Sequence, residues 1–362
     1  MGLVHSEIQQ EAPRGFHMDP RDFASLSGYR LLRGFPEGRL LSPPVGYLYG
    51  LRVTEVEQGS VTFTMPASPW LLSPQGILSG ASLALLVDGP LACTIQTALP
   101  PATPYTTSEL SMQYLRPVKA DGRLLTCRGR LVHAGQRLAM SEAEVVDADG
   151  NVIALASTRC VIMPALEVTP GRVGEPGPAV EPSWPTPHPY ERQVEGEVLP
   201  QETWDRLSGL EVMRGHISGE LPPPPICKLT GIWPITAEDG AMTWTMPATE
   251  WMSSPVAGQL YGGLTAFLAG MAIDGAFETV MPAGTAFASL DLKVYLLRPV
   301  PPDMRDLTAT AQVVQRGRRL CIGTCEVVNA DGKSVALGTA SAMVLPGRPA
   351  TVARAIDEAS AG

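Results

Sequence analysis

The length, composition and charge of this chain limit the classes it can belong to. With 362 residues it is too long for one ordinary core and fits two domains of about 150 residues. Hydrophobic residues make up 44% and charged residues 17%, which is typical of a globular protein with ample core material. The formal net charge of −9 argues against general binding to nucleic acid or to an anionic membrane, because both need a basic surface.

The sequence also shows no signal peptide, no membrane-spanning segment and no metal-binding motif. Residues 1–17 show no basic region followed by an apolar one, so we expect no signal peptide. The apolar run before Asp88 is too short to cross a bilayer. The 6 cysteines have no metal-like spacing, which predicts free thiols in a reducing cytoplasm, no metal site and no cofactor.

The strongest pattern is an internal repeat. SLSGYRLLRG (25–34) aligns with RLSGLEVMRG (206–215), an offset of 181 residues, and one insertion later the offset is 182. Alignment continues from there without a gap to Pro164 and Pro346. Such collinearity predicts two copies of one fold.

The repeat sets the expected domains. We place an N-terminal domain at 15–164 and a C-terminal domain at 196–348. Residues 165–195, rich in Pro and Gly, are expected to form an extended linker.

Each copy is predicted to have the same order of elements. A short helix comes first, then a Pro-rich approach, two alternating strands, one long apolar helix and at least three more strands. The predicted ranges are 20–32 and 201–213 for the short helices, 42–44 and 222–225 for the approaches, and 47–59 and 60–67 for the first two strands of copy one.

The strand after the long helix alternates with period two in both copies. In copy one Leu110 and Met112 fall on one face, while Thr107 and Glu109 fall on the other. Copy two repeats the pattern, with Ser289 and Asp291 on its polar face. This predicts a half-buried antiparallel sheet whose apolar face is covered by the long helix, an α+β fold.

The long helix of copy one, within residues 73–99, contains a single charged residue, Asp88. An acid inside an apolar helix is costly to bury without a partner or a purpose. In copy two, which begins near Ser254, the position matching Asp88 is Gly270. One copy has therefore kept an acid at this position and the other has not.

With these motifs the sequence resembles the hotdog-fold thioesterases, especially the branch related to phenylacetate-pathway acyl-CoA thioesterases. The resemblance covers nearly all of both repeats. It is carried by the G-x-x-x-G run that opens each helix (Gly76 to Gly80; Gly258 to Gly262), Asp88 eight residues after Gly80, the Arg-Pro pairs (Arg116-Pro117; Arg298-Pro299), the Gly-x-Arg turns (Gly135 to Arg137; Gly317 to Arg319) and the closing Asp-Gly turns.

The resemblance implies a long central helix wrapped by a curved antiparallel sheet, with active sites at the interface of two such units. A tandem chain supplies both units and forms an intrachain pseudo-dimer. It also implies that Asp88 faces the helix entry of copy two, Tyr261 to Gly263. The opposite site, Gly270 facing Ser79 to Ala81, is expected to lack its acid, so the resemblance implies one working site per chain.

Thioester hydrolysis needs a nucleophile or a base to activate water, together with donors for the developing oxyanion. Asp88, partly desolvated by neighbouring leucines, suits either role, and the Gly262 N–H at a helix N-terminus suits the oxyanion. The expected catalytic residues are Asp88, Gly262, Tyr261, Thr107 and, as a competing site on the strand before Arg-Pro, Asp291. Those expected to bind substrate are Gly263, Ser254, Arg116, Arg137, Arg298 and Arg318.

Each of these residues also has a purely structural interpretation. Asp88 can be a buried acid satisfied by its neighbours, Tyr261 can simply pack, and arginines in turns are often only solvated. The implied function is hydrolysis of acyl-CoA or acyl-carrier-protein thioesters, and the alternative is a catalytically silent hotdog protein that binds an acyl thioester. Association of double-hotdog chains is a further possibility, and the acyl group and the carrier are not readable from the residues.

Other enzyme classes fit less well. Hotdog hydratases use a His base, but all 5 histidines lie outside the central helices. Ser82 sits in a sequence similar to a nucleophile elbow, but it lies within the predicted helix and has no suitable His partner.

Overall fold

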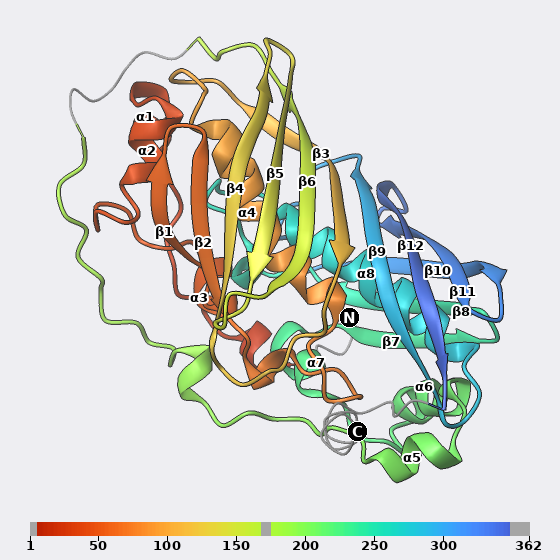
Figure 1. Ribbon diagram of the computed structural model, residues 1–362. Coiled ribbons are helices and arrows are strands. Elements are labelled where there is room, and N and C mark those ends of the chain that lie inside the picture. Colours follow the sequence, from red (N-terminus) through yellow and green to blue (C-terminus); the bar gives the residue numbers. More distant parts are fainter. Residues whose placement is uncertain (1–5, 168–174, 348–362) are drawn as a thin grey trace.

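A computed structural model describes residues 6–167 and 175–347. Residues 168–174 of the expected linker and residue 348 of the expected C-terminal domain lie outside the described residues. The described chain forms one 12-stranded sheet in the order β1-β2-β4-β5-β6-β3-β9-β12-β11-β10-β8-β7, with antiparallel pairing throughout. The helices that cover this sheet are short except for α4 and α8 (Figure 1).

The first half of the sheet comes from the first repeat. Its strands are β1 (Arg52–Glu57), β2 (Ser60–Pro66), β3 (Tyr105–Tyr114), β4 (Leu124–Ala134), β5 (Leu138–Val146) and β6 (Val152–Ile162), and its helices are α1 (Pro20–Ser25), α2 (Gly28–Arg33), α3 (Pro44–Tyr49) and α4 (Leu83–Gln96). Helix α4 packs on β2, β4, β5 and β6, so most of its residues are buried.

The second half repeats this arrangement. Its strands are β7 (Trp233–Glu238), β8 (Ala241–Pro247), β9 (Thr285–Leu296), β10 (Asp306–Arg316), β11 (Leu320–Val328) and β12 (Ser334–Pro346), and its helices are α5 (Gln201–Arg206), α6 (Gly209–Ser218), α7 (Pro225–Thr230) and α8 (Gly262–Thr279). Helix α8 packs on β8, β10, β11 and β12 and also on α4.

The two halves are related by a pseudo-two-fold axis. Strands β3 and β9 pair so that Ser111 lies opposite Lys293, its own counterpart in the repeat. Backbone hydrogen bonds cross reciprocally as well, from Val45 N to Ser253 O and from Ile226 N to Leu72 O. Each half therefore holds the other with equivalent contacts, as the subunits of a symmetric dimer would.

Several predicted boundaries are wrong in detail. The helices expected at 20–32 and 201–213 are each two helices, because Ser27 and Ser208 cap a new helix with their side chains. Residues 44–49 form helix α3 in place of the start of a strand, since Pro44 occupies the first turn, where its missing N–H costs nothing. Helix α4 is preceded by a short 3₁₀ turn, Gly80–Ser82.

The described linker residues run as an extended segment along the outside of the molecule (Figure 1). Ala179 N donates to Gly38 O, and the ring of Trp184 packs edge-on against the ring of Tyr47. Tyr47 donates a hydrogen bond of 2.9 Å to Glu181. The segment is thus attached to the first half along much of its length.

Candidate active site

Asp88 lies at the place where helix α4 meets the N-terminus of α8. Its Oδ2 accepts a hydrogen bond of 2.9 Å from the Gly263 N–H, the second residue of α8. Its Oδ1 is buried and has no hydrogen-bond partner among the described residues. The carboxyl group is therefore held at one oxygen and left free at the other.

Glycine at 263 allows the two helices to come this close. A Cβ at Gly263 would lie 2.5 Å from the Ala84 carbonyl oxygen and 3.1 Å from the Asp88 Cβ. The crossing is mirrored at Gly270, where a Cβ would lie 2.7 Å from the Ala81 Cβ. Small residues in both copies thus bring each helix to the entry of the other.

Burial raises the pKa of Asp88 to about 6. Desolvation is the largest cause, because it disfavours the charged form. The Gly263 amide and the nearby Thr107 hydroxyl act in the opposite direction, because both favour the charged form. The pKa lies close to neutral pH, as a carboxyl that accepts a proton during catalysis requires.

A β-bulge brings Thr107 to the helix side of the sheet. Strand β3 skips Ser108 in its pairing with β6, so Thr107 lies opposite the buried Cys160. The Thr107 Oγ1 is 3.8 Å from the Cys160 Sγ. The expectation that Thr107 shares a face with Glu109 is therefore wrong, because the extra residue reverses the alternation and turns the hydroxyl toward Asp88.

The entry of α8 supplies two further groups. Gly262 is the first residue of the helix, so its N–H has no intrahelical acceptor. Tyr261 is the N-cap residue, and its ring is 8% exposed. The Tyr261 hydroxyl is buried without a partner in the described part of the chain, and burial raises its pKa well above the ordinary value.

The opposite helix crossing also contains an acid. Asp274 accepts hydrogen bonds from the Ser289 hydroxyl at 2.7 Å and from the Ser79 hydroxyl at 3.4 Å. Burial raises its pKa to about 6, as at Asp88. The expectation that this interface lacks an acid is therefore wrong, because Asp274 lies one helical turn beyond Gly270 on the same side of α8.

Sequence alignment missed Asp274 because the acid has moved four residues along the repeat. Ser289, the counterpart of Thr107, was placed only on the polar face of its strand. A bulge at Leu290 turns it inward, since β9 skips this residue opposite β12. The available signal was the presence of charged residues in an otherwise apolar helix, the same signal that identified Asp88.

Asp291 lies on the outer face of β9. It shares a face of β9 with Lys293, while the alternate residues Leu292 and Val294 are buried beneath the sheet. Its carboxyl accepts a hydrogen bond from the Ser341 hydroxyl. On the same outer surface Glu109 forms ion pairs with Lys293 (3.2 Å) and Arg159 (3.3 Å). Asp291 therefore does not face Asp88, although its charge acts on Tyr114 of the neighbouring strand β3.

The expected substrate-binding residues are mostly exposed and occupied by local contacts. Arg116 donates to the Val152 carbonyl at 2.6 Å, and its counterpart Arg298 donates to the Ser334 carbonyl. Ser254 bonds to the backbone of Val256. Arg137 and Arg318 are exposed residues of hairpin turns. Only Gly263 of this set lies against Asp88.

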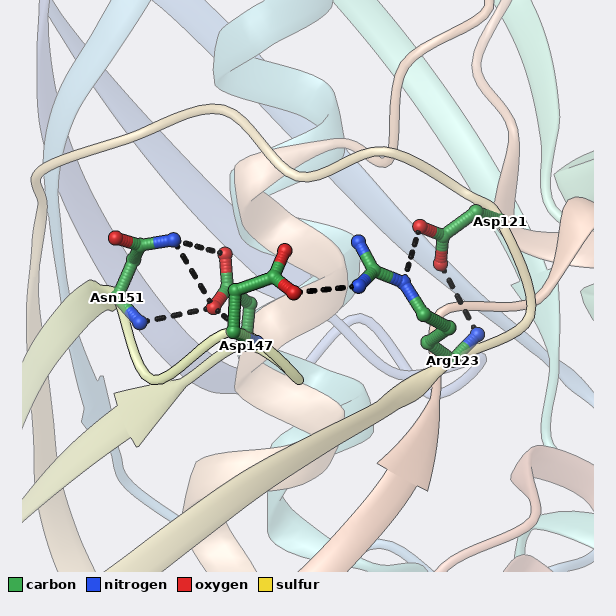
Figure 2. A network of polar contacts seen from close by, with 5 residues as sticks. Asp121, Arg123, Asp147 and Asn151 are labelled. Carbon is green, nitrogen blue, oxygen red and sulfur yellow. Dashed lines mark hydrogen bonds and ion pairs between the residues drawn. The ribbon is translucent and has the colours of Figure 1, made fainter.

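A surface hollow of about 240 Å³ lies away from Asp88, at the turns before β4 and after β5. At its edge Arg123 bonds to Asp121 and Asp149, each at 2.8 Å. Figure 2 shows Arg123 with Asp121 and, beside them, Asn151 bonded to Asp147. Arg305 forms the same two contacts in the second half. The same Arg–Asp contacts therefore occur in both halves, and both arginines are already engaged by aspartates.

Neither a metal centre nor a membrane span is found in the part of the chain that the structure describes. No group of three or more His, Cys, Asp or Glu side chains is placed to hold a metal ion within residues 6–167 and 175–347. No described helix is both long enough and apolar enough to pass through a bilayer.

Known families and structures match both halves of the chain. Residues 75–154 match the model of the thioesterase superfamily, and residues 249–343 match that of the acyl-CoA thioesterase N-terminal domain. No curated protein matches the sequence.

Among solved structures, the TesB protein of Mycobacterium avium subs paratuberculosis is 12% identical, with a TM-score of 0.52 over 84% of this chain and 98% of that one. The PaaI protein of Escherichia coli, from the phenylacetic acid degradation operon, is 28% identical over 39% of this chain and 97% of that one, with a TM-score of 0.34.

The repeated helix-in-sheet units and the likeness to the TesB structure make this chain a tandem hotdog protein. The two family models, one in each half, support a tandem hotdog thioesterase. The fold predicted from the internal repeat is thereby confirmed.

Proposed function

We propose that the protein hydrolyses acyl thioesters, carried by coenzyme A or by an acyl carrier protein, at the interface where Asp88 meets the entry of α8. The observation that carries the proposal is the buried Asp88 carboxyl, with one oxygen fixed by the Gly263 amide and the other unpartnered among the described residues. A base or nucleophile needs a free oxygen in a fixed position.

The reaction then follows from the groups present. The free Asp88 oxygen takes a proton from a water molecule as the water oxygen adds to the thioester carbonyl. The Gly262 N–H and the Tyr261 hydroxyl donate to the oxyanion that forms. When the carbon–sulfur bond breaks, the thiol leaves with the proton that Asp88 had taken, and the acyl group leaves as a carboxylic acid.

The Asp88 carboxylate also suits direct attack on the carbonyl: the carbon–sulfur bond breaks, the thiolate leaves and takes a proton from water, and the anhydride that has formed is hydrolysed to the free acid and the Asp88 carboxyl. The Thr107 hydroxyl, turned inward by the bulge, is placed to orient water in either case. The 6 free cysteines support a reducing cytoplasm as the site of action. Association of whole chains with one another stays a prediction.

The test is hydrolysis of short, long and aromatic acyl-CoA thioesters by the wild type and by Asp88→Asn, followed as release of free thiol. Asparagine keeps the shape and an acceptor for Gly263 but cannot take a proton. We expect the turnover number to fall by about 10²- to 10⁴-fold. Glu278→Gln, a buried acid on α8 beyond this crossing, is the matched control and should leave turnover nearly unchanged.

Two results would contradict the proposal. Turnover that survives Asp88→Asn removes Asp88 from the chemistry, and Asp291→Asn and Asp274→Asn then test the two other acids. If the wild type hydrolyses no thioester, the chain is the silent, acyl-binding hotdog protein that the sequence left as the alternative.

A further inference from the structure

The interface opposite Asp88 holds the same kinds of functional group in different positions. At the first crossing the acid is Asp88, the aliphatic hydroxyl is Thr107 and the phenol is Tyr261. At the second crossing the acid is Asp274 and the hydroxyl is Ser289, which is the counterpart of Thr107. The acid has shifted by one turn, and the hydroxyl has kept its place.

The phenol of the second crossing comes from a strand and not from the helix entry. Ser79 occupies the position of Tyr261, and Tyr114 of β3 lies against this entry instead. A Cβ at Gly80 would be 3.1 Å from the Tyr114 Cζ, the carbon that bears the hydroxyl. The Tyr114 hydroxyl is buried, and no described residue bonds to it.

The strand position that holds Tyr114 in one half holds Leu296 in the other. The Leu296 Cδ1 would be 3.3 Å from a Cβ at Gly262, so this leucine fills the first crossing where Tyr114 fills the second. Each crossing therefore has one phenol, supplied by the helix entry in one case and by the strand in the other. A degenerate interface would be expected to lose its polar groups to apolar packing, because buried polar groups are costly.

A buried hydroxyl without a partner is a donor that a ligand can satisfy. The Tyr114 hydroxyl and the helix entry at Ser79 and Gly80 face the same acid, whose oxygens are already held by Ser79 and Ser289. The Tyr114 hydroxyl, to which no described residue bonds, can donate to a carbonyl oxygen, but the set offers no free acid oxygen comparable with Asp88 Oδ1. Its chemistry suits binding of an acyl thioester better than its hydrolysis.

We infer that the interface formed by Ser79, Tyr114, Asp274 and Ser289 is a second acyl-thioester binding site, so that one chain binds two acyl thioesters. The inference rests on the proposed function for the class of ligand. The acyl carbonyl accepts from the Tyr114 hydroxyl at the entry of α4, as the substrate carbonyl does from Tyr261 at the entry of α8.

The test is calorimetric titration of the full chain with an uncleavable acyl-CoA analogue in which a methylene group separates sulfur from the carbonyl, in octanoyl and phenylacetyl forms. We expect two binding events per chain. Tyr114→Phe removes only the unpartnered hydroxyl and should weaken one event by about tenfold, the value of one hydrogen bond. Tyr261→Phe, the matched variant, should weaken the other.

Ser289→Ala provides a second variant of the same site and should weaken the event that Tyr114→Phe weakens. A stoichiometry of one overturns the inference, as does a second event that neither substitution at this interface changes. If the wild type hydrolyses thioesters but binds only one analogue molecule per chain, the proposed function stands and the second site is excluded. Two binding events without hydrolysis of any thioester keep the second site and remove the proposed function.

Discussion

The two helix crossings come from the same repeat, yet they hold their acids in opposite ways. Asp88 has a backbone amide on one oxygen and no described partner on the other. Asp274 has a serine hydroxyl on each oxygen. The comparison shows that the position of an acid does not define its role, because the number of hydrogen bonds it already accepts decides what it can still do.

The largest effect that should distinguish Asp88 from Asp274 is the dependence of turnover on pH. If ionised Asp88 is the base, turnover should be constant above pH 7 and fall about tenfold for each pH unit below its pKa of about 6. Asp274→Asn should leave this acidic limb in place although the pKa of Asp274 is also about 6. The measurement is kcat/KM for one thioester between pH 4.5 and 8.

If the fall in kcat/KM at acidic pH disappears in Asp274→Asn, the assignment of the chemistry to Asp88 is wrong. If the fall occurs at the same pH in the wild type and in Asp274→Asn, the assignment to Asp88 is supported. Glu278→Gln is the control here too, since burial raises the pKa of Glu278 to about 8 and so places its titration elsewhere.

The burial of Asp88 should also make the free energy of unfolding depend on pH. The raised pKa of Asp88 means that its contribution to stability is fully present below pH 4 and is lost as pH rises through about 6. Asp88→Asn lacks this loss, so at pH 8 it should be more stable than the wild type by about 2 to 3 kcal/mol, with little difference at pH 4. Urea unfolding at the two pH values measures this.

Asp121→Asn is the control of opposite sign. The guanidinium of Arg123 lowers the pKa of Asp121, so this exposed acid contributes above its ordinary pKa and its loss costs stability at high pH. Equal stability of Asp88→Asn and the wild type at pH 8 would show that the Asp88 carboxyl is not desolvated as the structure has it.

The glycines of the two crossings give the smallest effect. Gly263→Ala places a methyl group against the Ala84 backbone carbonyl and should destabilise the fold by about 1 to 3 kcal/mol. Gly270→Ala meets the Ala81 Cβ, at a slightly longer distance, and should cost less. The measurement is thermal unfolding of the two variants, and Gly263→Ala should have the lower melting temperature. A lower melting temperature for Gly270→Ala would mean that the helices pack more tightly at the second crossing.

The sequence was sufficient for the architecture. The repeat offset identified two copies, and the resemblance to the hotdog thioesterases implied that Asp88 faces the entry of α8, where the Gly263 amide bonds to it. These inferences depend on patterns that act over the whole repeat, which a local irregularity does not disturb.

The sequence was insufficient where one residue or one turn changes the geometry. The bulges at Ser108 and Leu290 reverse strand alternation, and nothing in the composition of either strand marks them. The acid of the second crossing was sought at Gly270, whereas a shift of four residues to Asp274 preserves the helix face. A sequence alignment matches residues by position, whereas residues four apart on a helix lie on the same face and can serve the same site.

The pairing of β3 with β9, and the linker between the halves, place both crossings within one covalent chain. In a dimer of identical subunits every substitution would appear at both interfaces, and dilution would separate them. Here each interface can change alone, and neither depends on protein concentration, since its two sides share a tether. Duplication followed by fusion thus gives the protein two independently mutable interfaces from one ancestral surface.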